Sequence, residues 1–194
     1  MDLAVRSYKT LVVTSSEKFN ETVLPLLSAA SCAVTKTVSS GMEARREALE
    51  NSFDIILINT SLPDEFGTKL ALDLAGDSGV GIMLFTSSEH FMEINSRVSR
   101  YGILVISKPT SSAIVAQSLS LLCATRERLR RMEQKTASIE EKMEEIRLVN
   151  RAKWVLIDKL DLSEPEAHRY IEKMAMDRSE TKREVADFII KNIQ

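Results

Sequence analysis

An amide side chain follows an apolar run at a point where α/β domains place their chemistry. Residues 53–67 read FDIILINTSLPDEFG, so the apolar residues 55–58 lead to Asn59 and then to a turn built around Pro63 and Gly67. Polar groups at the carboxyl ends of parallel strands are common functional positions. An ionised aspartate here could attack a phosphoryl group or hold a metal, whereas a neutral amide does not serve as the nucleophile. The stretch therefore predicts a strand that ends at a typical functional position but lacks the carboxylate that could attack a phosphoryl group.

Other catalytic and metal-binding sets are missing from the sequence. No paired carboxylates, Ser-His-Asp combination or glycine-rich phosphate loop is apparent, so we expect a protein that is not an enzyme and has no cofactor. Cys32 and Cys123 lie far apart, and neither belongs to a CxxC pair or lies near clustered histidines. Disulfide frameworks and metal sites are therefore poorly supported, and buried free thiols are the better interpretation.

Recurring apolar runs predict the elements that position Asn59. Strands rich in Val, Ile and Leu alternate with helix-compatible stretches, which is the pattern of a parallel sheet covered on both faces. Five such strands in about 110 residues suggest a flavodoxin-like, doubly wound α/β domain, which we assign to residues 1–118. The expected strands are 10–13, 32–38, 53–58, 80–85 and 102–106.

The composition is ordinary for a globular protein, with 194 residues, 44% hydrophobic residues and a net charge of −2. No apolar run approaches the roughly 18 to 20 residues of a membrane span, and the N-terminal residues do not resemble a secretory signal. We therefore expect a cytoplasmic protein without membrane contact. No segment is basic enough to indicate nucleic-acid binding by charge alone, so such binding must depend on how charges are arranged on a face.

A long helix is predicted after residue 111, because the residues are helix formers and no Gly or Pro occurs before Pro165. A heptad register through residues 119–149 gives a narrow apolar seam between charged faces, which favours a two-stranded coiled coil and hence a homodimer. The alternative is a helix that lies on its own domain. Asn150 also falls on the seam, where it could help to set the register. The seam residues are Leu122, Leu129, Met132, Ile139, Met143 and Ile146.

Residues 150–194 form the third predicted segment, a small all-α bundle of three helices. Ser163 with Glu166 three positions later is a capping box that starts a helix. Ser179 is the expected cap of the last helix, and Trp154 is expected in the core of the bundle. The expected buried face of the last helix comprises Val185, Ala186, Ile189, Ile190 and Ile193.

Residues 8–122 resemble the receiver domain of bacterial response regulators, the output half of two-component systems. NTSLPDEFG stands where receivers have their phosphoacceptor loop, FTSS at 85–88 matches the strand that ends in Thr or Ser, and SKP at 107–109 matches the Lys-Pro pair. Thr86 and Lys108 are therefore the expected family residues.

The sequence departs from the receiver pattern at the positions that carry the reaction. Ser15 and Ser16 align with the acidic pair that holds magnesium in receivers, Asn59 replaces the phosphoacceptor Asp, and Val105 stands where an aromatic switch residue is usual. Phosphoryl transfer needs a carboxylate nucleophile and a metal held by oxygen ligands. We therefore interpret the first domain as a pseudo-receiver, regulated if at all by a partner protein or a ligand. Its degenerate site comprises Ser15, Ser16, Asn59, Thr86 and Lys108.

Residues 140–194 resemble the ANTAR domain, the RNA-binding module of bacterial transcription antitermination regulators. The resemblance rests on the pair Ala152 and Lys153, on SEPEAHRYI, on AMD followed by Arg178, and on REVA. A receiver-like domain, a coiled coil and an ANTAR domain in this order are also the arrangement of that family. The resemblance implies that a dimer binds paired short hairpins in a nascent leader transcript, which prevents a terminator hairpin from forming.

Cationic and planar side chains in the last segment are the candidates for contacting RNA. RNA loops are recognised through phosphate contacts and through splayed bases that stack on flat side chains. His168 and Tyr170 offer planar surfaces, and the small side chain of Ala152 would allow close approach. The candidate RNA-contacting residues are Ala152, Lys153, His168, Arg169, Lys173, Arg178, Lys182 and Arg183. For Arg169 and Lys173, a simply solvated helix face is the alternative.

A different class of protein remains open on the sequence alone. The chain could be a non-catalytic adaptor, in which the first domain binds a partner protein and the helical tail only dimerises. Salt-sensitive binding to structured RNA separates the two readings, because phosphate contacts release counterions whereas an adaptor would show no such binding.

Overall fold

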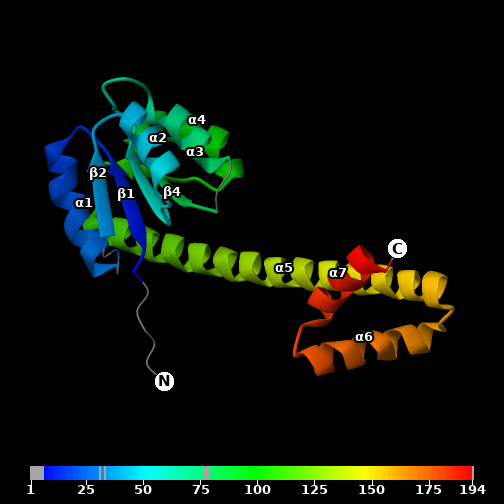
Figure 1. Cartoon of the computed structure of the whole chain (residues 1–194). Helices are drawn as coiled ribbons and strands as arrows, with labels where there is room; N and C mark the ends of the chain where they lie inside the picture. The colour runs from blue at the N-terminus through cyan, green and yellow to red at the C-terminus, as the bar shows by residue number, and fades with distance from the viewer. Residues whose placement is uncertain (1–6, 31, 33, 77–78, 194) are drawn as a thin grey trace. The chain divides into compact units, whose positions relative to one another are not determined.

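The computed structural model describes residues 7–30, 32, 34–76 and 79–193. The chain divides into two compact units between Arg131 and Met132, and each unit is considered by itself (Figure 1). This boundary lies inside the segment 119–149, for which the sequence predicts a coiled coil.

A parallel sheet of five strands forms the centre of the first unit, with the order β2-β1-β3-β4-β5. This order is that of a doubly wound domain, so the predicted fold class is confirmed. Pairing extends β3, β4 and β5 into polar residues, because Asn59 pairs with Phe85 and Ser87 with Lys108. The strands are β1 (Lys9–Val13), β2 (Val34–Val38), β3 (Ile55–Asn59), β4 (Gly81–Ser87) and β5 (Leu104–Lys108).

Helices cover both faces of this sheet (Figure 1). Apolar side chains of α1 and of the first turns of α5 pack on one face, and those of α2, α3 and α4 pack on the other. This two-sided burial explains why the strands read as continuous apolar runs. The helices are α1 (Glu17–Ala29), α2 (Gly41–Glu50), α3 (Gly67–Ala75), α4 (Ser88–Val98), a 3₁₀ turn η1 (Ser99–Tyr101) and α5 (Ser112–Leu160).

Leu122 belongs to the core of the first unit, which corrects its assignment to the coiled-coil seam. Its side chain is only 7% exposed and packs against the sheet at Gly81, where an added Cβ would lie 2.9 Å from the Leu122 Cγ atom. The apolar surface of Leu122 is therefore buried within the chain and is not available to a second helix. The next seam position, Leu129, is 42% exposed.

Cys32 and Cys123 are buried free thiols, as the sequence predicts. The Cys123 thiol hydrogen-bonds to Cys32, which lowers the pKa of Cys32. The two residues lie far apart in the sequence and meet only because α5 packs on the same sheet face as the segment before β2.

The end of α5 forms the second unit with α6 (Glu164–Arg178) and α7 (Lys182–Asn192). The capping box at the start of α6 is confirmed, and the Ser163 backbone N–H donates to the Glu166 carboxylate at 2.9 Å. The buried core comprises Ala152, Leu156, Ala167, Ile171, Ala175, Val185, Ala186 and Ile189. The predicted bundle and the buried face of its last helix are therefore present.

The predicted cap of the last helix is wrong. Ser179 ends α6 in a left-handed conformation with φ 53°, whereas Thr181 caps α7 and its hydroxyl accepts from the Glu184 N–H at 3.2 Å. The Thr181 N–H in turn donates to the Glu184 carboxylate at 2.8 Å, so the pair forms a second capping box.

The predicted burial of Trp154 is also wrong, because its side chain is 70% exposed. Ala152 and Leu156 are the inward positions and are both 0% exposed. Residues four apart lie on the same helix face, so the position halfway between them points to the opposite side. The position of Trp154 around the helix, and not the size of its side chain, therefore decides its exposure.

Residues 132–144 of α5 are all exposed, including Met132, Ile139 and Met143. Within the second unit these turns lie ahead of the bundle core, which begins with Leu148 and Val149. In the part of the chain that the structure describes, no helix is both long and apolar enough to cross a membrane.

Candidate functional site

Asn59 lies buried at the end of β3 and bridges two neighbouring polar groups. Its side chain is 4% exposed, and its amide nitrogen donates to the Thr14 hydroxyl at 3.1 Å. Its amide oxygen accepts from the Lys108 ammonium group. An amide offers both a donor and an acceptor, so a single neutral side chain satisfies partners on both sides. Asn59 is therefore a structural link in the centre of this sheet edge.

Of the two serines after β1, Ser16 supports the chain locally. Ser16 caps α1, because its hydroxyl accepts from the Phe19 N–H at 3.3 Å. Its own N–H donates to the Thr14 hydroxyl at 3.1 Å, and Ser15 is exposed. Among the described residues there is no group of three or more His, Cys, Asp or Glu side chains that could hold a metal ion.

Thr14 is the residue that sequence reasoning missed. Its hydroxyl accepts from both Asn59 and Ser16, so it joins the end of β3 to the start of α1. The available signal was its position directly after a buried strand, beside two polar residues. Thr86 at the end of β4 is 2% exposed and lies behind the same sheet edge.

Lys108 is the cation of this site and is only partly buried. Burial lowers its pKa, because the charged ammonium group loses water. The one described polar partner of the Lys108 ammonium group is the Asn59 amide oxygen, and this group forms no ion pair with a described carboxylate. An ammonium group carries three N–H donors, so two remain for a ligand or water.

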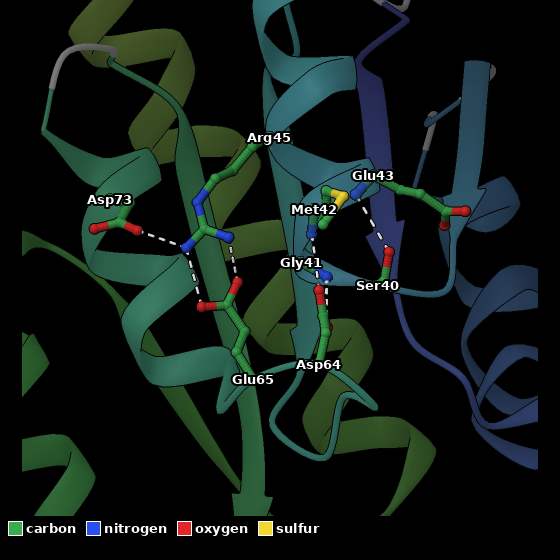
Figure 2. A network of polar contacts seen from close by, with 8 residues as sticks. All are labelled: Ser40, Gly41, Met42, Glu43, Arg45, Asp64, Glu65 and Asp73. Atoms are coloured by element: carbon green, nitrogen blue, oxygen red, sulfur yellow. Dashed lines mark hydrogen bonds and ion pairs between the residues drawn. The ribbon is translucent and has the colours of Figure 1, made fainter.

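The carboxylates of the loop after β3 are bonded to groups of α2 (Figure 2). Asp64 accepts from the backbone N–H groups of Gly41 and Met42, at 3.0 Å each, at the start of α2. These bonds lower the pKa of Asp64, and the positive end of a helix favours the charged form. Asp64 therefore serves the fold and is not available as a nucleophile beside Asn59.

The neighbouring Glu65 is also engaged (Figure 2). Arg45 of α2 pairs with both Glu65 oxygens, and its second amino group lies 2.6 Å from the Asp73 carboxylate of α3. The network links α2, the loop and α3. The first unit thus keeps acidic side chains where they hold the fold, and has a neutral amide where a phosphoacceptor would lie.

The second unit presents a different set of groups, in which several predicted RNA contacts form ion pairs. Lys153 lies 2.9 Å from Glu164, and Lys182 lies 2.7 Å from Glu172. His168 also contacts Glu172, at 3.3 Å. Pairs between exposed groups contribute about 0–1 kcal/mol, so an RNA phosphate can replace the carboxylate beside Lys182 or His168 at little cost. The Lys153 side chain is less accessible, at 16% exposed.

Other predicted contacts differ in how accessible they are. Ala152 is 0% exposed and packs in the bundle core, so it is not retained as an RNA contact. The guanidinium group of Arg178 lies 4.2 Å from the centre of the Phe188 ring. Arg183 lines a hollow of about 290 Å³ together with Lys142, Glu141 and Glu145, so two carboxylates there offset the two cations.

Arg169 and Lys173 form the outer cationic face of α6. They are four residues apart and therefore lie on the same side of the helix, both exposed. Neither forms an ion pair with a carboxylate in the described ranges. These two side chains are therefore free to contact phosphates.

The exposed residues of α5 include Trp154, which the sequence predicts to lie in the core. Trp154 shares a helix face with Arg147 and Arg151, at positions seven and three residues earlier. Both arginines are exposed. A flat aromatic ring flanked by cations is suited to stacking on a base beside a phosphate. The signal for this face was the helical phase of Ala152 and Leu156.

Comparisons with known proteins find similarities for both units. Residues 137–190 match the ANTAR domain family. The chain is 24% identical over 153 residues to the transcriptional regulatory protein PdtaR of Mycobacterium tuberculosis, an alignment that covers 79% of this chain and 75% of that protein.

The sheet-containing unit is similar to solved receiver domains. It aligns with the signal receiver domain of an HD domain-containing protein from Pseudomonas fluorescens Pf-5 with a TM-score of 0.58 and 18% identity, covering 65% of this chain and 93% of that one. The chemotaxis response regulator CheY4 of Vibrio cholerae gives a TM-score of 0.53 and 21% identity, covering 60% and 99%. The chain therefore combines a unit with the receiver fold and an ANTAR domain over residues 137–190, and it is similar over most of its length to a transcriptional regulatory protein.

Proposed function

We propose that this protein is an RNA-binding transcription antitermination regulator that binds hairpins in nascent leader RNA as a dimer. The observation that carries the proposal is the ANTAR match over residues 137–190, which include the exposed cationic face of α6 and the Trp154 face of α5. A protein that acts on nascent bacterial transcripts works in the cytoplasm, where we place it. It acts by binding and performs no catalysis of its own.

RNA contact in this proposal combines phosphates and bases. Arg169 and Lys173 approach phosphates directly, and Lys153 and Lys182 exchange their carboxylate partners for phosphates. Trp154 stacks on an unpaired base of the hairpin loop, which is how single-stranded bases are commonly bound. The sequence is nearly neutral overall, with a net charge of −2, so affinity must come from this local arrangement.

Dimerisation would further increase the affinity for RNA. The apolar seam side chains of α5 are between 42% and 60% exposed and repeat at heptad spacing, so a second copy of the helix would bury them. Two ANTAR domains on one transcript bind paired hairpins with a high effective concentration. The proposed seam comprises Leu129, Met132, Ile139, Met143 and Ile146.

The receiver-fold unit acts in this proposal without accepting a phosphoryl group. Asn59 has no carboxylate oxygen to attack with, and its amide is already bonded to Thr14 and Lys108. Ser15 and Ser16 are weak substitutes for the carboxylates that hold Mg²⁺. Dimerisation is therefore constitutive or controlled by a partner protein or a ligand.

A gel-shift titration tests the proposed function. The full chain is titrated against a library of two-hairpin leader RNAs at two salt concentrations, beside the double variant Lys153→Ala, Arg178→Ala. The matched control is Lys69→Ala, Arg97→Ala, which removes the same charge from exposed positions of the first unit. We expect binding that weakens with salt and is lost only in the first variant. Absence of RNA binding by a folded dimer would overturn the proposal and favour the adaptor.

A further inference from the structure

A pocket of about 280 Å³ opens beside Asn59, between the start of α1 and the start of α5. Its walls are largely apolar and include Phe19, Val23, Phe85 and Val115. A dry cavity of roughly 150 Å³ is sufficient to hold a benzene molecule. The pocket is therefore large enough for an aromatic ring with a short substituent, and too small for a peptide segment or a nucleic acid.

The charged side chains that line the pocket are positive. Lys108 and Lys18 contribute to its lining, and neither an aspartate nor a glutamate does. Lys108 donates to the Asn59 amide oxygen and forms no ion pair with any carboxylate that the structure describes, so donors remain for an anion. Burial also makes the ammonium group lose water, which a bound anion would compensate.

Two helix N-termini strengthen this preference for an anion. Ser16, the cap of α1, and Ser112, the first residue of α5, both line the pocket. Backbone N–H groups and the helix dipole make such ends favourable for negative charge. Lysine side chains and helix ends therefore line the same pocket.

The apolar end favours a flat ring. Phe19 and Phe85 meet edge to face, with ring centroids 4.8 Å apart and an interplanar angle of 79°. Aromatic side chains arranged in this way accept a further ring in offset or edge contact. A mostly apolar hollow with a few convergent polar groups is also the usual composition of a small-molecule site.

We propose that this pocket binds a small aromatic carboxylate, with its carboxylate on Lys108 and its ring against Phe19, over the buried Phe85 and Val115. The pocket lies beside the residue that replaces the phosphoacceptor, so the ligand would supply the input that phosphorylation supplies elsewhere. That regulatory role rests on the proposed function, whereas the binding itself does not depend on RNA.

Isothermal titration calorimetry of the full chain without RNA tests the proposal. The probes are phenylacetate and indole-3-acetate, the neutral phenylacetamide, and inorganic phosphate. The variants are Lys108→Met, which removes the charge, and Thr22→Trp, which fills the pocket from an exposed lining position. Lys69→Met and Ser28→Trp are the matched controls, because both sites are exposed and neither lines the pocket.

We expect at least one carboxylate to bind saturably, and phenylacetamide to bind about tenfold more weakly than phenylacetate because it lacks the charge. Lys108→Met and Thr22→Trp should each weaken carboxylate binding by about tenfold or more, and the two controls should leave it unchanged. Saturable binding of neither carboxylate, equal binding of the amide, or preferential binding of inorganic phosphate at Lys108 would overturn the proposal. Because RNA is absent, these outcomes are independent of the antitermination test.

Discussion

The strands of the first unit and residues 132–144 of α5 differ in where their apolar side chains lie. Every residue of β3 is buried, because helices of the same chain cover both faces of the sheet. Every residue from 132 to 144 is exposed, although Met132, Ile139 and Met143 are apolar. Burial of one such side chain contributes about 1.5–3 kcal/mol. The sheet is thus completed within the chain, whereas this part of the helix leaves its apolar side chains exposed, where the proposed second copy would bury them.

The largest expected effect comes from placing charges on the seam. Ile139→Asp with Met143→Asp puts like charges at two seam positions that would face their copies, so the dimer should dissociate to a monomer in sedimentation equilibrium. RNA affinity should then fall about 100-fold or more, because the effective-concentration gain is lost. Ala137→Asp on the outer face is the control. A double variant that remains dimeric would place the interface elsewhere.

Trp154→Ala should have the next largest effect, on RNA and not on assembly. Stacking of one base on an aromatic ring contributes about 1–3 kcal/mol, so the dissociation constant should rise roughly 5- to 150-fold in a gel shift. Trp154→Phe should retain most of the affinity. If Trp154→Ala leaves RNA binding intact but weakens the dimer, the exposed ring belongs to the interface between copies.

Asn59→Leu tests whether the amide is a structural link. The substitution removes the oxygen that accepts from Lys108 and the N–H that donates to Thr14. The buried Thr14 and the half-buried Lys108 then lose these hydrogen bonds. The free energy of unfolding, measured with urea, should fall by about 1–2 kcal/mol. Asn59→Asp keeps an acceptor for Lys108 and should cost less. Equal stability of Asn59→Leu and the wild type would contradict the assigned role.

Asp64→Asn should have the smallest effect and depend on pH. The Gly41 and Met42 N–H groups lower the pKa of Asp64 in the folded state below its ordinary value of about 3.9. Its stabilising contribution is therefore full above about pH 4 and is lost as pH falls through the folded-state pKa. Urea midpoints of wild type and variant should differ at pH 7 and converge as the pH falls below about 3. A constant difference across this range would contradict the account.

The sequence predicts the sheet well because its strands are long apolar runs buried on both faces. It places strand ends less well, since pairing with neighbours carries β3 to Asn59 and β5 to Lys108. Trp154 is exposed because its position on the helix, halfway between the buried Ala152 and Leu156, turns its large side chain outward. The signal for the cap of α7 is the glutamate three residues after Thr181, which Ser179 lacks.

The candidate site was predictable in part. Asn59, Lys108 and Thr86 follow from strand ends and from a family resemblance, because those positions meet at one sheet edge. The role of Thr14, the burial of Ala152 and the pocket beside Asn59 depend on packing between distant segments. No local pattern contains that information.

One measurement tests most directly whether this regulator has separated dimerisation from phosphorylation. The full chain is examined by sedimentation equilibrium and intact mass before and after incubation with acetyl phosphate and Mg²⁺. The account predicts no phosphoryl adduct and the same oligomeric state in both samples, because Asn59 cannot accept the group. A monomer that becomes a phosphorylated dimer after incubation would contradict it.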